Sequence, residues 1–485
     1  MTRLAFASRL FAGLLCLGLL ANCAVNPVTG RQNFVMMSES DEVRTGQKGD
    51  EEVRQEYGVY DNPALQRYVN EVGQRLAQKS HRGNLEYHFT VVDSPEINAF
   101  ALPGGYIYIT RGIMAYLSSE AELAAVLGHE IGHVTARHSV QQYSASMAAS
   151  IGVALGSILV PELRGGAQDL LNLLGNALLS GYGRDHELEA DRLGAEYLAR
   201  TGYDPQAMVK VVGVLKNQEQ FDAEIARGEG REPRRYHGLF ATHPDNDTRL
   251  KEVVGEANRF VQQSQTDSRQ AAYLAQVNGL IFGDSPSQGI VRDSRFLHEG
   301  LGFGLNFPPD WKVKNSPDKV IALSPENDGQ IELLLAGPAR DTPTEFLRRS
   351  VRLDAGNELE TGPINGLPAA IMSGIRQGKP VKVGVIFFRD QSFILVATAK
   401  TPSAYNRHQT EISSAIDSFH ALQDAERKLA KPTRIHTRTA KKGETFANLA
   451  RQSPLGKNAE GYLRLMNHAY PSGEPQAGQH LKTVE

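Results

Sequence analysis

The sequence predicts a multidomain α+β protein, and three observations lead to this fold class. The chain has 485 residues, 41% of them hydrophobic and 22% charged, which suffices for several globular domains. Residues 40–270 have mainly helical patterns around a few short strands. Beyond them, strand patterns prevail until a linker near residue 430. We therefore predict a leader at residues 1–23 and domains at residues 24–270, 286–424 and 434–485.

The charge of the chain argues against nucleic-acid binding. The formal net charge is -3 at pH 7, so no broad positive field would attract phosphates. Aromatic residues are not interleaved with basic ones either, as they are in many nucleic-acid surfaces. We therefore expect no nucleic-acid partner.

The first residues have the layout of a secretory signal. Arg3 and Arg9 precede an apolar run at residues 10–20, which is too short to span a membrane. Both cysteines of the chain, Cys16 and Cys23, lie in or at the edge of this leader. The exported part is therefore expected to contain no internal disulfide and no catalytic thiol.

The end of the leader resembles a bacterial lipobox, in which the cysteine becomes the lipidated first residue. The matching stretch is Leu20-Ala21-Asn22-Cys23, although Asn22 stands where a small residue is preferred. Two outcomes stay open: acylation of Cys23 with anchoring to the outer membrane, or cleavage near Ala21 with an incidental cysteine. Both outcomes place the protein in the periplasm.

Hydrophobic spacing and turn residues predict the elements of the first domain. Apolar residues at helical spacing predict an amphipathic helix over residues 40–79. Strands are expected at residues 88–92 and 106–110, the second after a Pro-Gly-Gly turn. A core helix is expected from Ser119 to about His138, because Ser119 can cap it and acids follow in its first turn.

Further segments complete this domain. The apolar residues 145–160 contain two glycines and are too short to span a bilayer, so they predict a lid or a buried helix. A second long helix is expected at residues 187–199, before Gly202. The charged residues 224–235 predict a loop, and residues 262–270 a polar linker.

The stretch HEIGHVTARH, residues 129–138, indicates a metal site. Positions four apart share one helix face, so His129 and His133 can place two imidazole nitrogens on one metal while Glu130 lies beside it. Two neutral imidazoles suit zinc and leave room for a third protein ligand and a water. Apolar neighbours make this a core helix, where histidines without such a role would be costly to bury.

Acids at the start of the second helix are candidates for the third ligand. Glu187 and Asp191 lie four apart on one face, as a metal ligand and an acid that orients a ligand histidine would need to lie. Glu189, between them, is expected to point away. The alternative is that all three acids form a solvated helix start.

This combination of motifs resembles the gluzincin metalloproteases related to the CAAX prenyl proteases, and specifically their soluble bacterial periplasmic branch. The resemblance extends over roughly residues 24–260. The matching stretches are His129-Glu130-Ile131-Gly132-His133 with Arg137-His138, residues 187–191, Asn26-Pro27-Val28-Thr29-Gly30, Asn98-Ala99-Phe100, Thr110-Arg111-Gly112, and Thr242-His243-Pro244 with Arg249.

The resemblance implies a mainly helical zincin-like protease domain with a small sheet and one bound Zn²⁺. It makes His129, His133 and Glu187 the zinc ligands and Glu130 the general base that takes a proton from the attacking water. Asp191 matches the acid of the family's second motif, which implies an orienting role or that of a proton donor. Because the chain has no convincing spans, processing of prenyl peptides inside a membrane is not implied.

Two further residues are catalytic candidates. Arg249 can stabilise the oxyanion, with a surface salt bridge as the alternative. His243 can donate to the transition state, occupy the fourth zinc position and exclude water, or cap a loop before Pro244. The strand at residues 106–110 is expected to offer an edge to which an extended, unfolded polypeptide adds as another strand.

The last two predicted domains differ from the first. Residues 286–424 predict an α+β domain without a catalytic constellation, in which Trp311 belongs to the core. Its strands are expected at residues 304–307, 330–335, 381–388 and 393–397, and its helices at residues 344–353 and 404–419.

Residues 434–485 resemble a LysM-type module, which implies peptidoglycan as a partner. The matching pieces are Lys442-Gly443-Glu444-Thr445-Phe446, Leu449-Ala450, residues 463–467, and Gly478-Gln479 with Leu481-Lys482. The alternative is a small βααβ unit that merely packs on the protease.

The sequence and its resemblance therefore indicate a zinc-dependent endopeptidase of the bacterial cell envelope that degrades misfolded or unassembled proteins. Two other classes of function stay open at this point. One is a metal-dependent peptidoglycan amidase, and the other is a non-catalytic cell-wall binding protein.

Overall fold

The computed structural model describes residues 23–35, 37–156, 182–228 and 269–485, together with the single residues 249, 252, 255 and 259. The chain divides into two compact units. Unit 1 comprises the chain up to residue 54 with residues 59–280 and 434–485, and unit 2 comprises residues 55–58 and 281–433. The predicted leader lies outside the described residues, except for Cys23, the first residue of strand β1 (Cys23–Val25).

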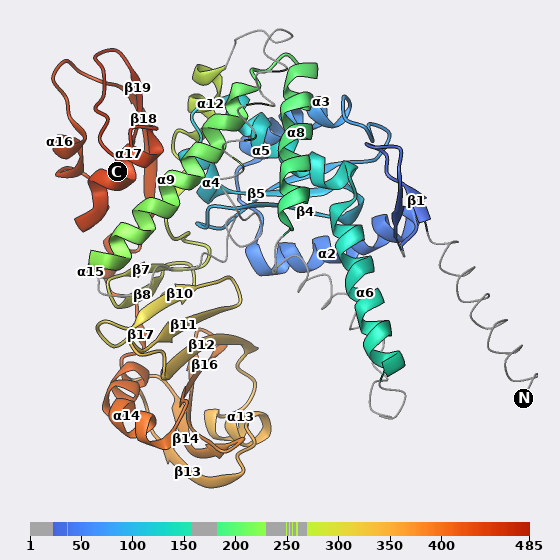
Figure 1. Ribbon diagram of the computed structural model, residues 1–485. Helices are drawn as coiled ribbons and strands as arrows, with labels where there is room; N and C mark the ends of the chain where they lie inside the picture. Colours follow the sequence, from blue (N-terminus) through green and yellow to red (C-terminus); the bar gives the residue numbers. More distant parts are fainter. Residues whose placement is uncertain are drawn as a thin grey trace, which may run out of the picture. The chain divides into compact units, whose positions relative to one another are not determined.

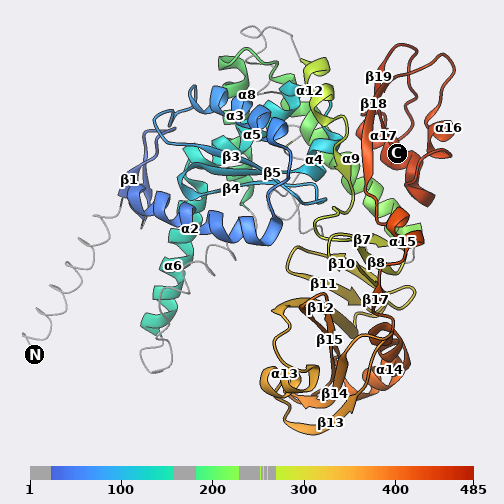
Figure 2. The ribbon, with the colours of Figure 1, turned by 180° about the vertical axis from the view of Figure 1, so that it is seen from behind.

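Unit 1 contains a small sheet in the strand order β3 (His88–Val92), β5 (Tyr106–Thr110), β4 (Ala99–Leu102) (Figures 1 and 2). Strands β3 and β5 run parallel, and β4 is antiparallel to β5. The strands predicted at residues 88–92 and 106–110 are confirmed. The expectation that residues 106–110 form an edge is wrong, because β5 is paired on both sides and the edge strands are β3 and β4.

Two helices cover opposite faces of this sheet, α2 (Glu39–Tyr57) and α3 (Pro63–Ala77) (Figure 2). On one face, the Tyr108 hydroxyl donates to Asp50 of α2 at 2.6 Å. On the other, the ring of Phe89 packs directly on the backbone of Gly73 in α3. Residues 40–79 are therefore two helices rather than the one predicted. The break follows from Asn62, whose side chain caps α3 by accepting from the Leu65 N–H at 3.1 Å.

Helices α4 (Arg111–Tyr116) and α5 (Glu120–Thr135) follow the sheet, and α5 is buried along its whole length. The predicted cap is confirmed, since the Ser119 hydroxyl accepts from the Glu122 N–H at 3.2 Å. The helix ends at Thr135, short of the predicted His138. The reason is that Arg137 has a left-handed backbone with φ of 58°, which breaks the helix and starts α6 (His138–Gly156).

Three more helices follow in the described residues: α8 (Arg184–Arg200), α9 (Gln206–Gly228) and α12 (Gln270–Val277). Helix α8 confirms the second long helix and begins three residues before the predicted start at residue 187. Because α9 continues to Gly228, the loop predicted at residues 224–235 is wrong for residues 224–228. Residues 157–160 and 262–268 lie outside the described residues, and no described helix is long and apolar enough to cross a membrane.

The N-terminal end of the described chain is a short hairpin of β1 and β2 (Gln32–Phe34). The Asn26 side chain accepts from the N–H groups of Val28 and Thr29 at 2.8 and 3.1 Å, and Gly30 closes the turn with φ of 67°. The motif Asn-Pro-Val-Thr-Gly is therefore a hairpin turn.

Residues 434–485 belong to the same compact unit as the helices above. Their elements are β18 (Thr433–Thr439), α16 (Phe446–Ala450), the 3₁₀ turn η3 (Gly456–Asn458), α17 (Ala459–Met466) and β19 (His480–Val484). Strands β18 and β19 pair antiparallel. The order of elements agrees with the predicted βααβ unit, whereas the assignment to the LysM type stays a prediction.

Unit 2 is built from two antiparallel sheets. One has the order β17-β9-β8-β7 and the other the order β10-β11-β12-β16-β15-β14-β13. Their strands are β7 (Ile290–Arg292), β8 (Arg295–His298), β9 (Phe303–Asn306), β10 (Lys312–Asn315), β11 (Lys319–Leu323), β12 (Gly329–Pro338), β13 (Ala355–Thr361), β14 (Ala369–Arg376), β15 (Lys379–Phe388), β16 (Gln391–Ala399) and β17 (His420–Ala421). The two-residue strand β6 (Ile281–Phe282) belongs to neither sheet. The helices are α13 (Pro343–Ser350), α14 (Pro402–Asp417) and α15 (Asp424–Leu429).

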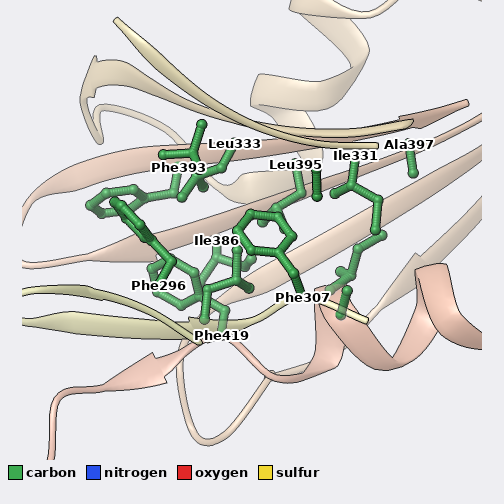
Figure 3. Packing of buried hydrophobic residues seen from close by; sticks show 14 of the residues in the cluster. Phe296, Phe307, Ile331, Leu333, Ile386, Phe393, Leu395, Ala397 and Phe419 are labelled. Atoms are coloured by element: carbon green, nitrogen blue, oxygen red, sulfur yellow. The ribbon is translucent and has the colours of Figure 1, made fainter. Parts of the chain in front are cut away.

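The core of unit 2 lies between its strands and α14 (Figure 3). Alternate residues of β12 and β16, such as Ile331, Leu333 and Leu395, point into it beside Phe393 and Phe419. Trp311 is part of the same cluster and only 5% exposed, which confirms that it is a core residue. The α+β class predicted for this part is also confirmed.

Candidate metal centre

Helix α5 places the side chains of the HEIGH motif at the centre of unit 1. His129, Glu130 and His133 are all buried, with exposed fractions of 5%, 1% and 1%. Burial lowers the pKa of His133 well below its usual value, which keeps the imidazole neutral as a metal ligand must be. The helix therefore presents two buried imidazoles, that of His133 held neutral by its burial, and the buried side chain of Glu130.

Glu187 reaches the same point from α8 because the two helices approach closely. A Cβ on Gly132 would lie 3.0 Å from Ala190, and one on Gly194 would lie 3.0 Å from the His129 backbone nitrogen. Glycine at these two positions lets the backbones of α5 and α8 pack without intervening side chains. This contact brings the first turn of α8 beside the motif on α5.

The three candidate ligands converge on one point. His129 Nε2 and His133 Nε2 lie 3.0 Å apart, and they lie 3.6 and 3.4 Å from the two carboxylate oxygens of Glu187. Donor atoms about 2.0 Å from a tetrahedral zinc ion are separated by about 3.3 Å. His129, His133 and Glu187 thus fit a zinc ion, and they are brought together as the sequence predicts.

Asp191 and Arg249 form a buried ionic group behind His129. Asp191 Oδ1 lies 2.8 Å from His129 Nδ1, and the Arg249 guanidinium donates to both Asp191 oxygens at 2.8 Å. Arg249 Nη1 is also 3.2 Å from Glu187. Arg249 is only 3% exposed, so the expected alternative of a surface salt bridge is wrong.

The charges in this group reinforce one another. Burial raises the pKa of Asp191, but the charge and hydrogen bonds of Arg249 and the bond with His129 outweigh it and hold the pKa below its usual value. Burial in turn lowers the pKa of Arg249, but the charges of Asp191 and Glu187 raise it above the usual value. Both side chains are therefore ionised at neutral pH.

A second set of residues lies behind His133 and was not among the predicted site residues. His133 Nδ1 lies 2.9 Å from His138 Nδ1, and His138 Nε2 lies 3.2 Å from Glu189. The Tyr182 ring stacks on His133 with centroids 4.0 Å apart. As expected, Glu189 is not among the three side chains that converge on the metal position. It does contact His138, which in turn contacts the candidate ligand His133. The signal in the sequence was His138 itself, at the end of the motif.

The remaining predicted residue, His243, lies outside the described residues, as do its neighbours Thr242 and Pro244. The structure therefore leaves its three alternative roles as predictions.

The chain is similar to proteins of known name. The family model described as Peptidase family M48 matches residues 63–257. The beta-barrel assembly-enhancing protease of Escherichia coli (strain K12) is 34% identical over 408 residues, which cover 77% of this chain and 80% of that protein. Its counterpart from Yersinia pestis is 30% identical over 296 residues, or 57% of this chain and 58% of that protein. The mitochondrial metalloendopeptidase OMA1 of Schizosaccharomyces pombe is 31% identical over 230 residues, or 47% of this chain and 64% of that protein.

Proposed function

The chain belongs to peptidase family M48 and is a zinc metalloendopeptidase, and from this premise we propose that it degrades misfolded or unassembled polypeptides of the bacterial cell envelope. The observation that carries the proposal is the convergence of His129, His133 and Glu187 around one point, with Glu130 beside them. The relatives named for β-barrel assembly support a substrate among envelope proteins.

In this proposal, His129, His133 and Glu187 hold the zinc ion. When bound, the ion supplies Lewis acidity, which polarises the scissile carbonyl and lowers the pKa of a water toward about 7. Glu130 takes the proton of the attacking water, because it lies next to His129 on α5 without being one of the converging ligands. Asp191 orients His129, and Arg249 holds Asp191 and Glu187 in place.

The geometry of Asp191 and Arg249 favours these positioning roles over the alternatives. An ionised Asp191 has no proton to donate at neutral pH, and its oxygens are occupied by His129 and Arg249. Arg249 directs its nitrogens to Asp191 and Glu187 rather than to open space. The role of Arg249 as an oxyanion clamp remains a prediction from the sequence.

For His243, the two active roles predict opposite results. If it occupies the fourth zinc position, His243→Ala raises the rate of cleavage of an unfolded protein, since a catalytic zinc needs an open position. If it donates to the oxyanion, the same change lowers the rate about 10²-fold or more. An unchanged rate and zinc affinity would leave only the loop-capping role.

The substrate is proposed to add as a strand to β4. Among the described residues this strand is paired with β5 on one side only, and it packs along α5, which carries the two candidate histidine ligands. Main-chain pairing at a strand edge accepts many sequences but requires an extended segment. The proposal therefore favours unfolded segments over folded proteins.

The proposed location is the periplasm, with two candidate attachments. Lipidation of Cys23 would anchor the protein to the outer membrane, and residues 434–485 would bind peptidoglycan if they are of the LysM type. Cys23→Ser tests the first, because it should release the protein from membranes. Equal membrane association of both forms, or none in either, would remove the lipid anchor from the proposal.

The experiment for the main proposal compares two substrates on the full chain. We expect casein, an unfolded protein, to be cleaved, cleavage to stop on chelation and to return with Zn²⁺, and peptidoglycan to stay intact. Glu187→Ala should lose both zinc and cleavage, since it removes a ligand. Digestion of peptidoglycan with casein untouched would instead make the protein an amidase.

A further inference from the structure

The two candidate histidine ligands differ in what lies behind them. His129 contacts a carboxylate directly, through Nδ1 and Asp191 Oδ1 at 2.8 Å. His133 contacts a second imidazole instead, His138, at 2.9 Å between the two Nδ1 atoms. A metal-binding histidine normally needs an acceptor for its other N–H, because that bond fixes the tautomer and the ring orientation. For His133, the group in this position is His138.

Metal binding dictates one arrangement of protons along this chain of contacts. His133 Nε2 must carry a lone pair toward the metal, so the ring proton is on Nδ1 and is donated to His138 Nδ1. His138 then carries its own proton on Nε2, which faces Glu189 Oε2 at 3.2 Å. The carboxylate of Glu189 accepts this proton in a hydrogen bond. The opposite direction would put a proton on His133 Nε2 and block the metal.

Packing holds both rings in the planes that these bonds need. Tyr182 stacks on His133 at an interplanar angle of 18°, and His186 stacks on His138 at 19°. The side chains of His133 and His138 are fully buried, while that of Glu189 is 23% exposed. The left-handed backbone at Arg137, held by a 3.1 Å bond to Glu42, turns His138 back toward the motif. The contact is therefore built by several elements.

We infer that His138 and Glu189 are a positioning pair for the zinc ligand His133, as Asp191 is for His129. Glu189 fixes the tautomer of His138, and His138 fixes the tautomer and orientation of His133. The inference rests on the zinc-binding role proposed for His133, and its readout is zinc affinity rather than cleavage. Neither residue touches substrate.

The first test separates the hydrogen bond from the packing of the ring. Asparagine places its oxygen near the position of the histidine Nδ1, whereas glutamine places it nearer that of Nε2. In competition with a chromophoric chelator, we expect the full chain with His138→Gln or His138→Ala to bind Zn²⁺ about 10- to 100-fold more weakly. His138→Asn should stay within a few-fold of the wild type. Equal losses in the Asn and Gln variants would overturn the inference.

The second test asks whether Glu189 acts through His138. Glu189→Ala should weaken zinc binding in the wild type but have no further effect in a His138→Asn background, where its partner is gone. The matched control is Glu196→Ala on the same helix, because both glutamates lie within 4 Å of Arg192, at 3.9 and 3.8 Å, and only Glu189 contacts His138. Additive losses, or equal losses from Glu196→Ala, would contradict the pairing.

The visible spectrum of the Co²⁺-bound protein distinguishes a change in ligand geometry from a general loss of folding. With Co²⁺ in place of zinc, the visible d–d bands report the ligand geometry, so His138→Gln should change them in protein that melts as the wild type does. Bands identical to the wild type in all His138 variants would mean that His138 does not orient the ligand.

Discussion

Asp191 is the residue whose surroundings define its role most closely. Both of its oxygens accept from Arg249, Oδ1 also faces His129 Nδ1, and the residue is 2% exposed. Removing its charge would take from the buried Arg249 guanidinium the carboxylate that accepts two of its hydrogen bonds, which is costly. The role of an orienting acid therefore accounts for its charge, its burial and its partners together.

Asp191→Asn tests that role. The amide keeps the size but loses the charge, so we expect zinc to bind about 10- to 100-fold more weakly, together with a loss of cleavage. A chelator competition on purified protein measures the first effect. Unchanged zinc affinity with cleavage abolished would instead support the role of proton donor.

Lys482 is buried, and no carboxylate in the described part of the chain accepts a hydrogen bond from it. Its Nζ donates to the carbonyl oxygens of Ala115, at 2.8 Å, and of Leu117. Burial lowers the pKa of Lys482 to about 7, although Glu122 acts against the shift. A neutral amine has two N–H groups, which match these two carbonyls.

This shift makes a prediction about stability and pH. Above pH 7 the folded state releases a proton from Lys482 that the unfolded state keeps until its ordinary pKa, so the free energy of unfolding rises with pH. The free energy of unfolding of the wild type minus that of Lys482→Met should therefore increase from pH 7 to 9, by at most about 1.4 kcal/mol per pH unit. Urea unfolding at several pH values measures it. The exposed Lys442→Met is the control, and a flat difference for Lys482→Met would contradict the burial of its charge.

At the residue scale, the spacing of the motifs predicted which candidate site residues meet. The contacts behind these residues depend on local backbone geometry, which the spacing does not contain. His129, His133, Glu187 and Asp191 follow from pairs four apart on two helices. The contact between His138 and Glu189 could not be predicted in this way. It depends on the left-handed backbone of Arg137, and helical spacing turns Glu189 away from Glu187.

At the scale of the elements, the backbone groups of β4 determine how a substrate strand would pair in the proposed mode of binding. The Thr110 N–H donates to the Asn98 carbonyl at 3.1 Å, so the next residue, Ala99, turns its N–H and C=O away from β5. Ala101 does the same two residues later. These groups lie at the edge of the sheet, on residues that are buried with exposed fractions of 0% and 1%, and they are the ones that pair with a substrate strand in the proposal.

This geometry predicts a period of two in the substrate. Methylating the backbone nitrogens of a cleaved peptide one at a time should raise KM by about 2- to 10-fold at alternate positions, the scale of one lost hydrogen bond. The intervening positions should tolerate the methyl group, because their N–H groups point away from β4. A uniform effect at every position would exclude pairing with the strand edge.

At the element scale, the sequence predicted the type of most elements but not their neighbours. The strands at residues 88–92 and 106–110 have the predicted bounds. Their order in the sheet depends on the parallel pairing of β3 with β5, which local sequence patterns do not predict. The break between α2 and α3 was readable in the sequence, since Asn62-Pro63 is a cap followed by a first-turn proline.

In the whole molecule, residues 434–485 pack on the protease part of unit 1. Lys482 and His468 donate to the carbonyls of Ala115, Tyr116 and Leu117, at the end of α4 and just before α5. Phe221 of α9 contacts Tyr462 and Tyr470, with ring centroids 5.0 and 5.6 Å apart. Because these partners are more than 200 residues apart in the chain, no local pattern could have predicted the contact.

These contacts predict that residues 434–485 stabilise the protease. Ending the chain at residue 433 would expose Phe221 and leave the three carbonyls without their donors, at a cost of several kcal/mol. We expect a melting temperature lower by more than about 5 °C and weaker zinc binding. A truncated protein that melts as the full chain does and keeps its zinc would instead identify these residues as a separate attachment module.

The most direct test of the whole account is zinc content and cleavage of unfolded casein, measured on the same sample of Glu130→Gln. Since Glu130 lies beside the ligands but is not one of them, we predict one zinc ion per chain, as in the wild type. Cleavage should fall by about 10²- to 10⁴-fold, the scale of losing a general base. Loss of the zinc together with the activity, or full activity without the carboxylate, would contradict the account.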